Sequence, residues 1–560
     1  MEREALVMQY RELDRDIALF HREFSGSGRA DYLRLIPNLE NKAKLCDELA
    51  ALQQRTAALA TPEPVFEIMK KQMTDALKAS SVRLTAVFSK PHMTVTEIAR
   101  YAQFAYREFA TNDEEKSRRF LACAEQLPKV WEAVQEWIGD VPIENLRPFP
   151  VICRVSVENI KYHVEHLAEE YSHMNPWFQK IVGEALLGAC EKLTEYAAFV
   201  EEKYLKDDPG RQAETDDAIV KLDEQYYRTV LWDSLGVDFD AILSWHEAEI
   251  EKTRARMFSI ARSLPVPEAK DVRTAADVNA ILLKYAGPCD NIYDLYRKGV
   301  EYLERARKEA YNYIWLPEGV YCTCQVTPYE WRFSWPWGGS EGCDPGTDPL
   351  TGTMILNKYN YKNVTDGWIK MNAVHESFPG HFCQGVRSIT DTLPETMKMP
   401  GVRSTPLIEG TAHRSETLFE FIYPEDPFYP LFTAYRQHHT AVRIKADLML
   451  RYFGRPIKDA VKLYMDELDY DYTTARGQVK QQEDMEGYFT TYYFGYKKIS
   501  ELEAQYKDQY DEKQFTEILF SIGRVSVDIL EMYLALPEDQ KRSYRYDFKS
   551  LLMTREFPAH

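Results

Sequence analysis

Apolar residues recur three and four positions apart over most of the first 310 residues, and this spacing constrains the fold more than any other feature. Residues 4–24 and 239–264 both repeat it, as amphipathic α-helices do. A third segment, 175–207, opens with an Asn-Pro pair suited to a helix start and ends before a Pro-Gly pair. Glycine is scarce, at 25 of 560 residues, which favours helices. We therefore expect a mainly α-helical protein with an N-terminal helical region over residues 1–310.

The sequence changes character after residue 310. Residues 313–357 are rich in aromatic residues, glycine and proline, and they contain two short β-type runs, at 319–326 and 351–357. These runs predict a small sheet whose two strands are joined by a long aromatic loop. Helices are expected again from about Asp366 almost to the C-terminus, so we predict a second region over residues 311–560.

Charge and cysteine content narrow the possible partners. The formal charge is −19 and there is no basic run, so nucleic-acid binding is not expected. Charged residues interrupt the first 20 positions, and no run of about 18 apolar residues occurs, so we expect neither a signal peptide nor a membrane span. The nine cysteines are scattered, which suits reduced thiols. Together these features predict a cytoplasmic protein, with the oligomeric state left open.

Residues 372–385, NAVHESFPGHFCQG, contain the candidate metal site. A common zinc-hydrolase pattern is H-E-x-x-H, in which two histidines four residues apart share one helix face. Here His375 and His381 are six apart, and on a straight helix they would diverge by about 120°. A Pro-Gly pair between them can break the helix, so we expect the chain to turn and to bring the second histidine back to the first. Glu376 would then be the general base.

A carboxylate ligand is expected on a later helix, predicted over residues 404–423 with a Ser or Thr cap at its start. Glu409 and Glu416 are two turns apart among apolar neighbours, so they share a face. Either could bind the metal, and a salt bridge to Arg403, Arg414 or another arginine is the alternative for each. Four tyrosines crowd residues 488–496, and their hydroxyls could donate to an oxyanion, with ordinary aromatic packing as the alternative.

Other polar residues have weaker signals. Arg443 could bind a substrate carboxylate, because a planar guanidinium fork suits that anion; an ordinary salt bridge is the alternative. His438 and His439 are adjacent and therefore point to different helix faces, so at most one of them could join a site. His246 also precedes a glutamate, but no second histidine lies nearby, and a solvated helix face is expected there.

Three segments together resemble one family. HESFPGH is similar to the HExxPGH signature of the bacterial domain of unknown function 885 family. LIEGTAHRSE resembles that family's EGWAxYxE segment, with Thr411 and Arg414 in place of Trp and Tyr, and TTYYFGYKKISEL resembles its Tyr-x-x-Gly-Lys segment. TGTMILN matches its short strand that ends in Asn, here Asn357. The resemblance covers about residues 313–505.

The family is similar in plan to the helical gluzincin peptidases, which include thimet oligopeptidase. The resemblance implies a large helical ellipsoid with a central cleft and a small sheet beside the active-site helix. The implied zinc ligands are His375, His381 and Glu409. Glu376 would be the base, Glu416 would hold a ligand histidine, and Tyr492 would assist the oxyanion. Asn357 and Arg443 are assigned to substrate binding.

Three functions are therefore weighed. The leading hypothesis is a zinc-dependent peptidase on short peptides, of carboxypeptidase or dipeptidase type. The second keeps the site but cleaves a non-peptide amide or an acyl-amino-acid conjugate. The third is a non-catalytic helical protein whose metal only braces the fold. A structural zinc site would have four protein ligands and no need of Glu376, which favours a catalytic reading.

Overall fold

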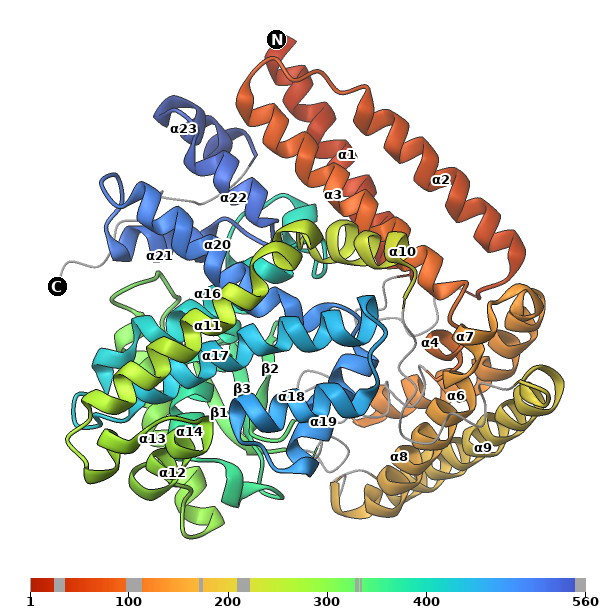
Figure 1. Ribbon diagram of the computed structural model, residues 1–560. Coiled ribbons are helices and arrows are strands. Elements are labelled where there is room, and N and C mark those ends of the chain that lie inside the picture. The colour runs from red at the N-terminus through yellow and green to blue at the C-terminus, as the bar shows by residue number, and fades with distance from the viewer. Residues whose placement is uncertain are drawn as a thin grey trace. The chain divides into compact units, whose positions relative to one another are not determined.

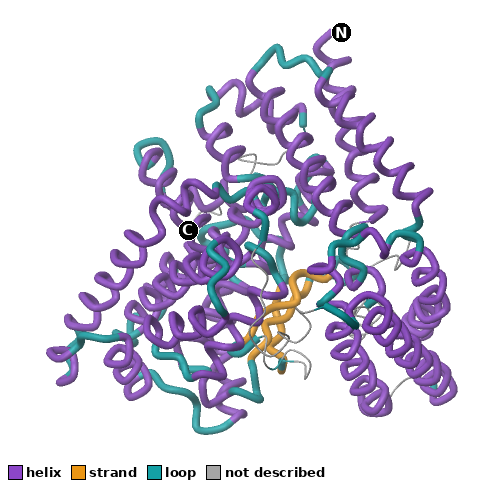
Figure 2. The backbone as a smooth tube through the Cα atoms, turned by 45° about the vertical axis from the view of Figure 1, so that its right-hand side comes forward, coloured by secondary structure: helices purple, strands orange, loops and turns teal. Residues whose placement is uncertain are grey.

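The computed structural model describes residues 2–24, 36–96, 113–170, 175–208, 222–327, 332 and 335–548 of the chain. Helices dominate, and the strands form one small three-stranded sheet (Figures 1 and 2). The mainly α-helical class that the sequence predicts is therefore confirmed. Among the described residues, no helix is both long enough and apolar enough to cross a membrane.

One compact unit comprises Arg15–Ala58 and Ser80–Ala218. Its core is aromatic: the Trp131 and Tyr196 rings stack with centroids 4.4 Å apart, and the Trp137 indole donates to the backbone oxygen of Pro37. The helices that lie wholly in this unit are α2 (Leu39–Ala57), α4 (His92–Val95), α6 (Asp113–Gln135), α7 (Ile143–Leu146), α8 (Pro148–Glu170) and α9 (Pro176–Val200).

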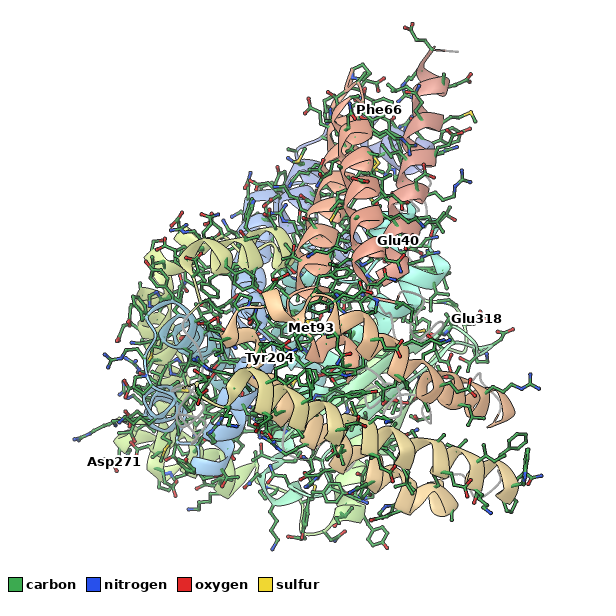
Figure 3. The ribbon with its side chains drawn as sticks, turned by 90° about the vertical axis from the view of Figure 1, so that its right-hand side faces the viewer. Glu40, Phe66, Met93, Tyr204, Asp271 and Glu318 are labelled. Carbon is green, nitrogen blue, oxygen red and sulfur yellow. The ribbon has the colours of Figure 1, made fainter. Side chains whose placement is uncertain are left out.

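The other unit comprises Met1–Asp14, Leu59–Ala79 and Ile219–His560, so α1 (Glu2–Phe24) and α3 (Pro64–Val87) contribute to both. The change of composition near residue 310 falls inside this unit. Its first two segments join its C-terminal part through aromatic contacts. Phe66, which is labelled in Figure 3, packs against Tyr10 and Phe548, with ring centroids 5.1 and 5.6 Å away.

The helices of this unit frame the sheet and the candidate site. Before the sheet they are α10 (Glu224–Thr229), α11 (Phe239–Ser263), α12 (Ala275–Tyr285) and α13 (Ile292–Ala310). After it they are α14 (Asp366–Asn372), α15 (His381–Thr390), α16 (Thr405–Leu418), α17 (Tyr429–Asp447), α18 (Ile457–Leu468), α19 (Tyr472–Asp484), α20 (Thr491–Tyr506), α21 (Glu512–Ser521), α22 (Val527–Leu534) and α23 (Glu538–Asp547).

The sheet has the strand order β1-β3-β2, with β1 (Tyr321–Val326) parallel and β2 (Gly338–Asp344) antiparallel to β3 (Thr351–Leu356). One face packs against α13 and α15. Gly299 of α13 lies so close that an added Cβ would come within 2.8 Å of the Leu356 side chain, and a Cβ at Gly352 would come within 2.4 Å of Phe382. The segment that carries His375 therefore follows, after α14, a sheet packed tightly against helices.

Helix α17 lies at the centre of this unit. Every residue in it except Pro430 and Lys445 is buried, although many of its side chains are polar. It packs against α11 and α20, and α20 crosses α16 in turn. At that crossing the backbones touch, because a Cβ added to Gly410 would lie 2.4 Å from the carbonyl carbon of Gly495.

Several local predictions are confirmed and two are wrong. Asn175 caps α9 by accepting from the Trp177 amide, and helices resume at Asp366 as expected. The segment predicted as a loop between two strands contains the strand β2, whose Gly-rich sequence, GGSEGCD, gives no β signal. Ser404 precedes α16 at the cap position, but its side chain makes no capping hydrogen bond.

Candidate metal centre

A π-helical segment, Ala373–Ser377, carries His375 and Glu376, and α15 begins with His381. The Phe378–Pro379 peptide bond between them is cis. Gly380 fits because it has no Cβ: one added there would lie 1.9 Å from the backbone oxygen of His375. The structure brings the two histidines together across this break, with ring centroids 4.8 Å apart.

Glu409 of α16 completes a three-residue group. Its Oε2 lies 3.4 Å from Nε2 of His375 and 3.4 Å from Nε2 of His381, and the ligand atoms all lie within 4.8 Å of one another. Glu409 is 3% exposed, and its Oε2 is buried without a hydrogen-bond partner among the described residues. Two histidine nitrogens and one carboxylate oxygen without a hydrogen-bond partner therefore lie close enough together to share a metal ion.

The other nitrogen of each histidine has its own acceptor. His375 Nδ1 lies 2.7 Å from Oε1 of Glu416, and His381 Nδ1 lies 2.9 Å from Oε1 of Gln384. Carboxylate and amide oxygens only accept, so both Nδ1 atoms donate. Gln384 is fixed in turn, because its amide nitrogen donates to the backbone oxygen of Ile408. Both Nε2 atoms therefore face Glu409, the arrangement that metal-ligating histidines adopt.

The charges of the group favour a cation at its centre. Burial alone would lower the pKa of His375, but the neighbouring carboxylates of Glu409 and Glu416 raise it to about 10. Burial alone would raise the pKa of Glu409, yet the two histidines hold it well below its usual value. The carboxylates thus attract positive charge to the space between the ligand atoms, whether a proton or a metal ion carries it.

Glu416 sits behind His375 and is almost fully buried. Its Oε2 accepts from His413 Nδ1 at 3.0 Å, and Arg436 Nε lies 3.6 Å from its Oε1. Thr440 in turn bonds Nε2 of His413 at 2.9 Å. The structure therefore separates the two candidate glutamates: Glu409 faces both histidines, and Glu416 orients one of them.

The arginines that sequence offered as salt-bridge partners bind elsewhere. Arg403 pairs with Asp75, and Arg414 pairs with Glu503. Neither pairs with Glu409 or Glu416 among the ion pairs of the described residues. Glu416 does have an arginine neighbour, Arg436, at 3.6 Å, whereas the ion pairs of Glu409 are with His375 and His381.

Glu376 differs from the other acids of the cluster. It is partly exposed, and it makes no hydrogen bond or ion pair within the described part of the chain. It lies next to His375 in sequence, and its charge contributes to the raised pKa values of both His375 and His381. Its carboxylate is therefore available to a water molecule or a substrate.

The four tyrosines have different positions. Tyr488 donates to Oε1 of Glu409, and Tyr492 lies parallel to the His375 ring at a centroid distance of 6.1 Å. Tyr493 donates to Glu249, and Tyr496 accepts from Gln437. Tyr488 and Tyr492 therefore border the cluster, and the other two have packing roles.

The remaining candidates fall outside the three-residue group. Asn357 is fully buried, and its amide is saturated: it donates to two backbone oxygens and accepts from two backbone amides, which leaves nothing to offer a substrate. His438 bonds Thr253 and Glu467, and His439 bonds Arg436 and Gln478. His246 is buried and bonds backbone oxygens of its own helix instead of facing solvent.

Arg443 is also buried, at 6% exposed, and it forms no salt bridge with any residue that the structure describes. Its Nε and Nη2 both donate to Oε1 of Gln478, and its guanidinium lies 5.3 Å from the Tyr492 ring centroid. Among the described residues, the guanidinium of Arg443 therefore contacts a neutral amide and aromatic rings.

Sequence reasoning missed several residues of the cluster. They are Gln384, His413, Arg436, Thr440 and Gln478. Gln384 had a local signal, since it follows His381 by three residues and so reaches back along the helix. The others reach the cluster from α16, α17 and α19 through packing, for which the sequence carries no local signal.

Comparisons with known proteins agree with this fold. A sequence model of the family described as "Bacterial protein of unknown function (DUF885)" matches residues 35–534. No curated protein matches the chain. Among solved structures, a "putative lipoprotein" from Colwellia psychrerythraea is similar, with a TM-score of 0.76 and 15% identity over 95% of this chain and 98% of that one. A "putative lipoprotein of unknown function" from Shewanella oneidensis is also similar, with a TM-score of 0.66 and 15% identity over 95% of this chain and 98% of that one.

Proposed function

This chain belongs to the DUF885 family of bacterial proteins of unknown function, and we propose that it is a zinc-dependent hydrolase that cleaves amide bonds of short peptides. The observation that carries the proposal is the position of Glu409 Oε2, 3.4 Å from each histidine Nε2. Tetrahedral zinc with bonds of 2.0–2.1 Å separates its ligand atoms by about 3.3–3.4 Å. The buried oxygen without a hydrogen-bond partner also fits a metal ligand.

His375, His381 and Glu409 would hold the zinc ion. Bound zinc supplies Lewis-acid chemistry, polarising a carbonyl oxygen and lowering the pKa of a water molecule. Glu376 would take the proton of the attacking water at its carboxylate and pass it to the leaving amine. The Tyr492 hydroxyl would donate to the oxyanion that forms on the substrate.

A catalytic role fits the site better than a structural one. Structural zinc sites are closed by four protein ligands, whereas three ligating residues converge in the described part of this chain. Glu376 would have no purpose in a structural site, yet it lies beside the group with its carboxylate unpaired among the described residues. The plan of the helical gluzincin peptidases, including a substrate cleft, is part of the same proposal.

Metal content tests the proposal first. Wild type, His381→Ala and Glu376→Gln would be purified and their zinc measured by mass spectrometry. We expect about one zinc per chain in wild type, loss in His381→Ala, and retention in Glu376→Gln with loss of hydrolysis. Absence of zinc from wild type after zinc is supplied, or hydrolysis by Glu376→Gln, would overturn the assignment.

Substrate and location need separate measurements. A panel of dipeptides beside acyl-amino acids and simple amides would separate a peptidase from an amidohydrolase with the same site. The cytoplasmic location predicted from the sequence stays a prediction, and fractionation of cells that produce the full-length protein would test it. Recovery with the membrane fraction would contradict it.

A further inference from the structure

Helix α17 buries two arginines on one face. Arg436 and Arg443 are seven residues apart, which is two helical turns, and they are 5% and 6% exposed. A buried guanidinium keeps its charge, so each of them needs a counter-charge or a full set of acceptors.

Only one of the two has an acidic neighbour. Arg436 lies 3.6 Å from Glu416 and also donates to His439 Nδ1 at 3.2 Å. Arg443 directs both Nε, at 3.3 Å, and Nη2, at 2.8 Å, to the single oxygen Oε1 of Gln478. No carboxylate of the described residues pairs with Arg443, and burial together with Arg436 lowers its pKa.

The neutral groups that join the arginines do not supply a negative charge. Burial and the two arginines lower the pKa of His439 well below its usual value, so this histidine is neutral. It accepts from Arg436 at Nδ1, and its Nε2 therefore donates to Oε1 of Gln478 at 3.1 Å. The group formed by Arg436, Arg443, His439 and Gln478 thus holds two cations, and its one carboxylate neighbour among the described residues is Glu416, beside Arg436. The excess positive charge therefore lies at Arg443.

Two side chains of this group have donors without acceptors. The Nε atom of Arg436 and the Nε2 atom of Gln478 are buried without hydrogen-bond partners in the described part of the chain. The Nη1 atom of Arg443 makes no hydrogen bond with any described residue. Donors without acceptors beside an uncompensated cation are the composition of a site for an anion.

This group lies within reach of the candidate metal centre. The guanidinium carbon of Arg443 is 5.3 Å from the Tyr492 ring centroid, and that ring is 6.1 Å from the ring of His375. Arg443 is therefore no farther than about 11 Å from the His375 ring. An extended peptide spans about 3.3–3.6 Å per residue, so at most about three residues beyond a cleaved bond would bring a terminal carboxylate to the arginine.

We propose that Arg443, supported by Gln478 and Arg436, binds the free carboxylate of the substrate. The substrate class is then short peptides and acyl-amino acids with a free C-terminus, cleaved within about three residues of that end. This inference rests on the proposed function for the bond that is cut, whereas the anion site itself rests on the contacts of the two arginines.

Binding of a matched pair of ligands tests the site without relying on turnover. The pair is an N-acetylated tripeptide with a free C-terminal carboxylate and the same tripeptide as its C-terminal amide. Titration calorimetry in the zinc-supplied Glu376→Gln background gives both dissociation constants. We expect the acid to bind about 10- to 100-fold more tightly, as for charge-assisted hydrogen bonds. Equal affinities, or no binding of either ligand at millimolar concentration, would overturn the proposal.

A charge change at Gln478 gives the sharpest variant. Gln478→Glu keeps the shape of the side chain and places a carboxylate where Arg443 already donates. It should fill the anion site from within, so the acid-to-amide preference should fall to about one while the melting temperature stays at or above that of wild type. A folded Gln478→Glu protein that still prefers the acid would contradict the proposal.

Two arginine variants complete the design. Arg443→Met should abolish the preference, and Arg443→Lys should reduce it because a lysine lacks the planar fork. Arg451→Lys is the matched control: Arg451 is equally buried on the continuation of the same helix, but it donates to the backbone oxygen of Gln482. It should retain the preference, and a loss as large as that of Arg443→Met would overturn the assignment.

The failure of the two proposals can be told apart. Preference for the acid without hydrolysis of any amide would support the anion site and remove the hydrolase. Hydrolysis of acids and C-terminal amides at equal kcat/KM would support the hydrolase and remove the anion site.

Discussion

Replacement of Glu416 by Gln would test how the cluster holds its first histidine. In the wild type both carboxylate oxygens are acceptors: Oε1 receives His375 Nδ1 at 2.7 Å, and Oε2 receives His413 Nδ1 at 3.0 Å. Glutamine offers one acceptor oxygen and one NH2 donor at nearly the same volume. One of the two imidazole N–H groups must therefore face another donor, or its ring must change tautomer.

The size of the effect follows from this mismatch. One unsatisfied buried hydrogen bond costs about 1–3 kcal/mol of stability. If the mismatch falls on His375, the ring loses the partner that holds its Nε2 toward Glu409. Loss of such a partner typically weakens metal binding about 10- to 100-fold, which is about 1.4–2.8 kcal/mol. The variant should also lose its attraction to Arg436, which lies 3.6 Å away.

Zinc affinity is the decisive measurement. Competition with a coloured chelator at neutral pH would give the zinc dissociation constants of wild type and Glu416→Gln, and thermal melting of the metal-free proteins would report stability. Glu249→Gln is the control, because Glu249 is also buried and accepts from Tyr493 but does not contact a candidate ligand. A zinc affinity in Glu416→Gln within about threefold of wild type, or an equal loss in the control, would refute the reasoning.

Three further predictions use the same structure. Tyr488→Phe should weaken zinc binding about tenfold with little loss of kcat per bound metal, whereas Tyr492→Phe should keep the metal and lower kcat about 10²- to 10³-fold; the reverse result would exchange their roles. Burial raises the pKa of Asp447 to about 6, above its unfolded value of about 3.9, so its stability contribution is full below about pH 4 and is lost as pH rises through 6. The free energy of unfolding of Asp447→Asn should therefore exceed that of wild type by up to about 3 kcal/mol at pH 7 but not at pH 4. Urea unfolding at both pH values would measure the difference, and an equal difference at both would exclude this titration. Gly410→Ala should lower the free energy of urea unfolding by about 1–3 kcal/mol and weaken zinc binding, because its Cβ would come within 2.4 Å of the α20 backbone; unchanged zinc affinity would show that the crossing does not set the site.

Features encoded within a short segment were predictable from sequence. The Asn-Pro start of α9 and the return of helices at Asp366 depend on neighbouring residues alone. The approach of His375 and His381 was predictable for the same reason, since a helix break inside a six-residue spacing leaves few other outcomes. Strand β2 was not predictable in this way, because its glycines carry no β preference. Its hydrogen bonds with β3, rather than its own sequence, stabilise the extended conformation.

The rest of the cluster depends on packing between distant segments. Spacing put Glu409 and Glu416 on one helix face but could not tell which of them meets both histidines, because that depends on where α15 lies against α16. Arg436 was not predicted, since a helix with polar residues all round gives no sign that it is buried. The neutral partner of Arg443 was equally hidden: the sequence allowed a substrate carboxylate or an ordinary salt bridge, and it gave no sign of the contact with Gln478.

The crossing of α16 and α20 shows why two short segments had to be read together. Gly410 lies next to the candidate ligand Glu409, and a Cβ on Gly495 would lie 1.8 Å from the backbone oxygen of Pro406, so neither helix has room for a side chain where they meet. Only at this separation can Tyr488, just before α20, donate to Glu409 on α16. Each glycine alone weakens its helix. Their joint effect is to set the distance between the ligand and the hydroxyl that orients it, so the two glycines belong to the site as much as the side chains that face it.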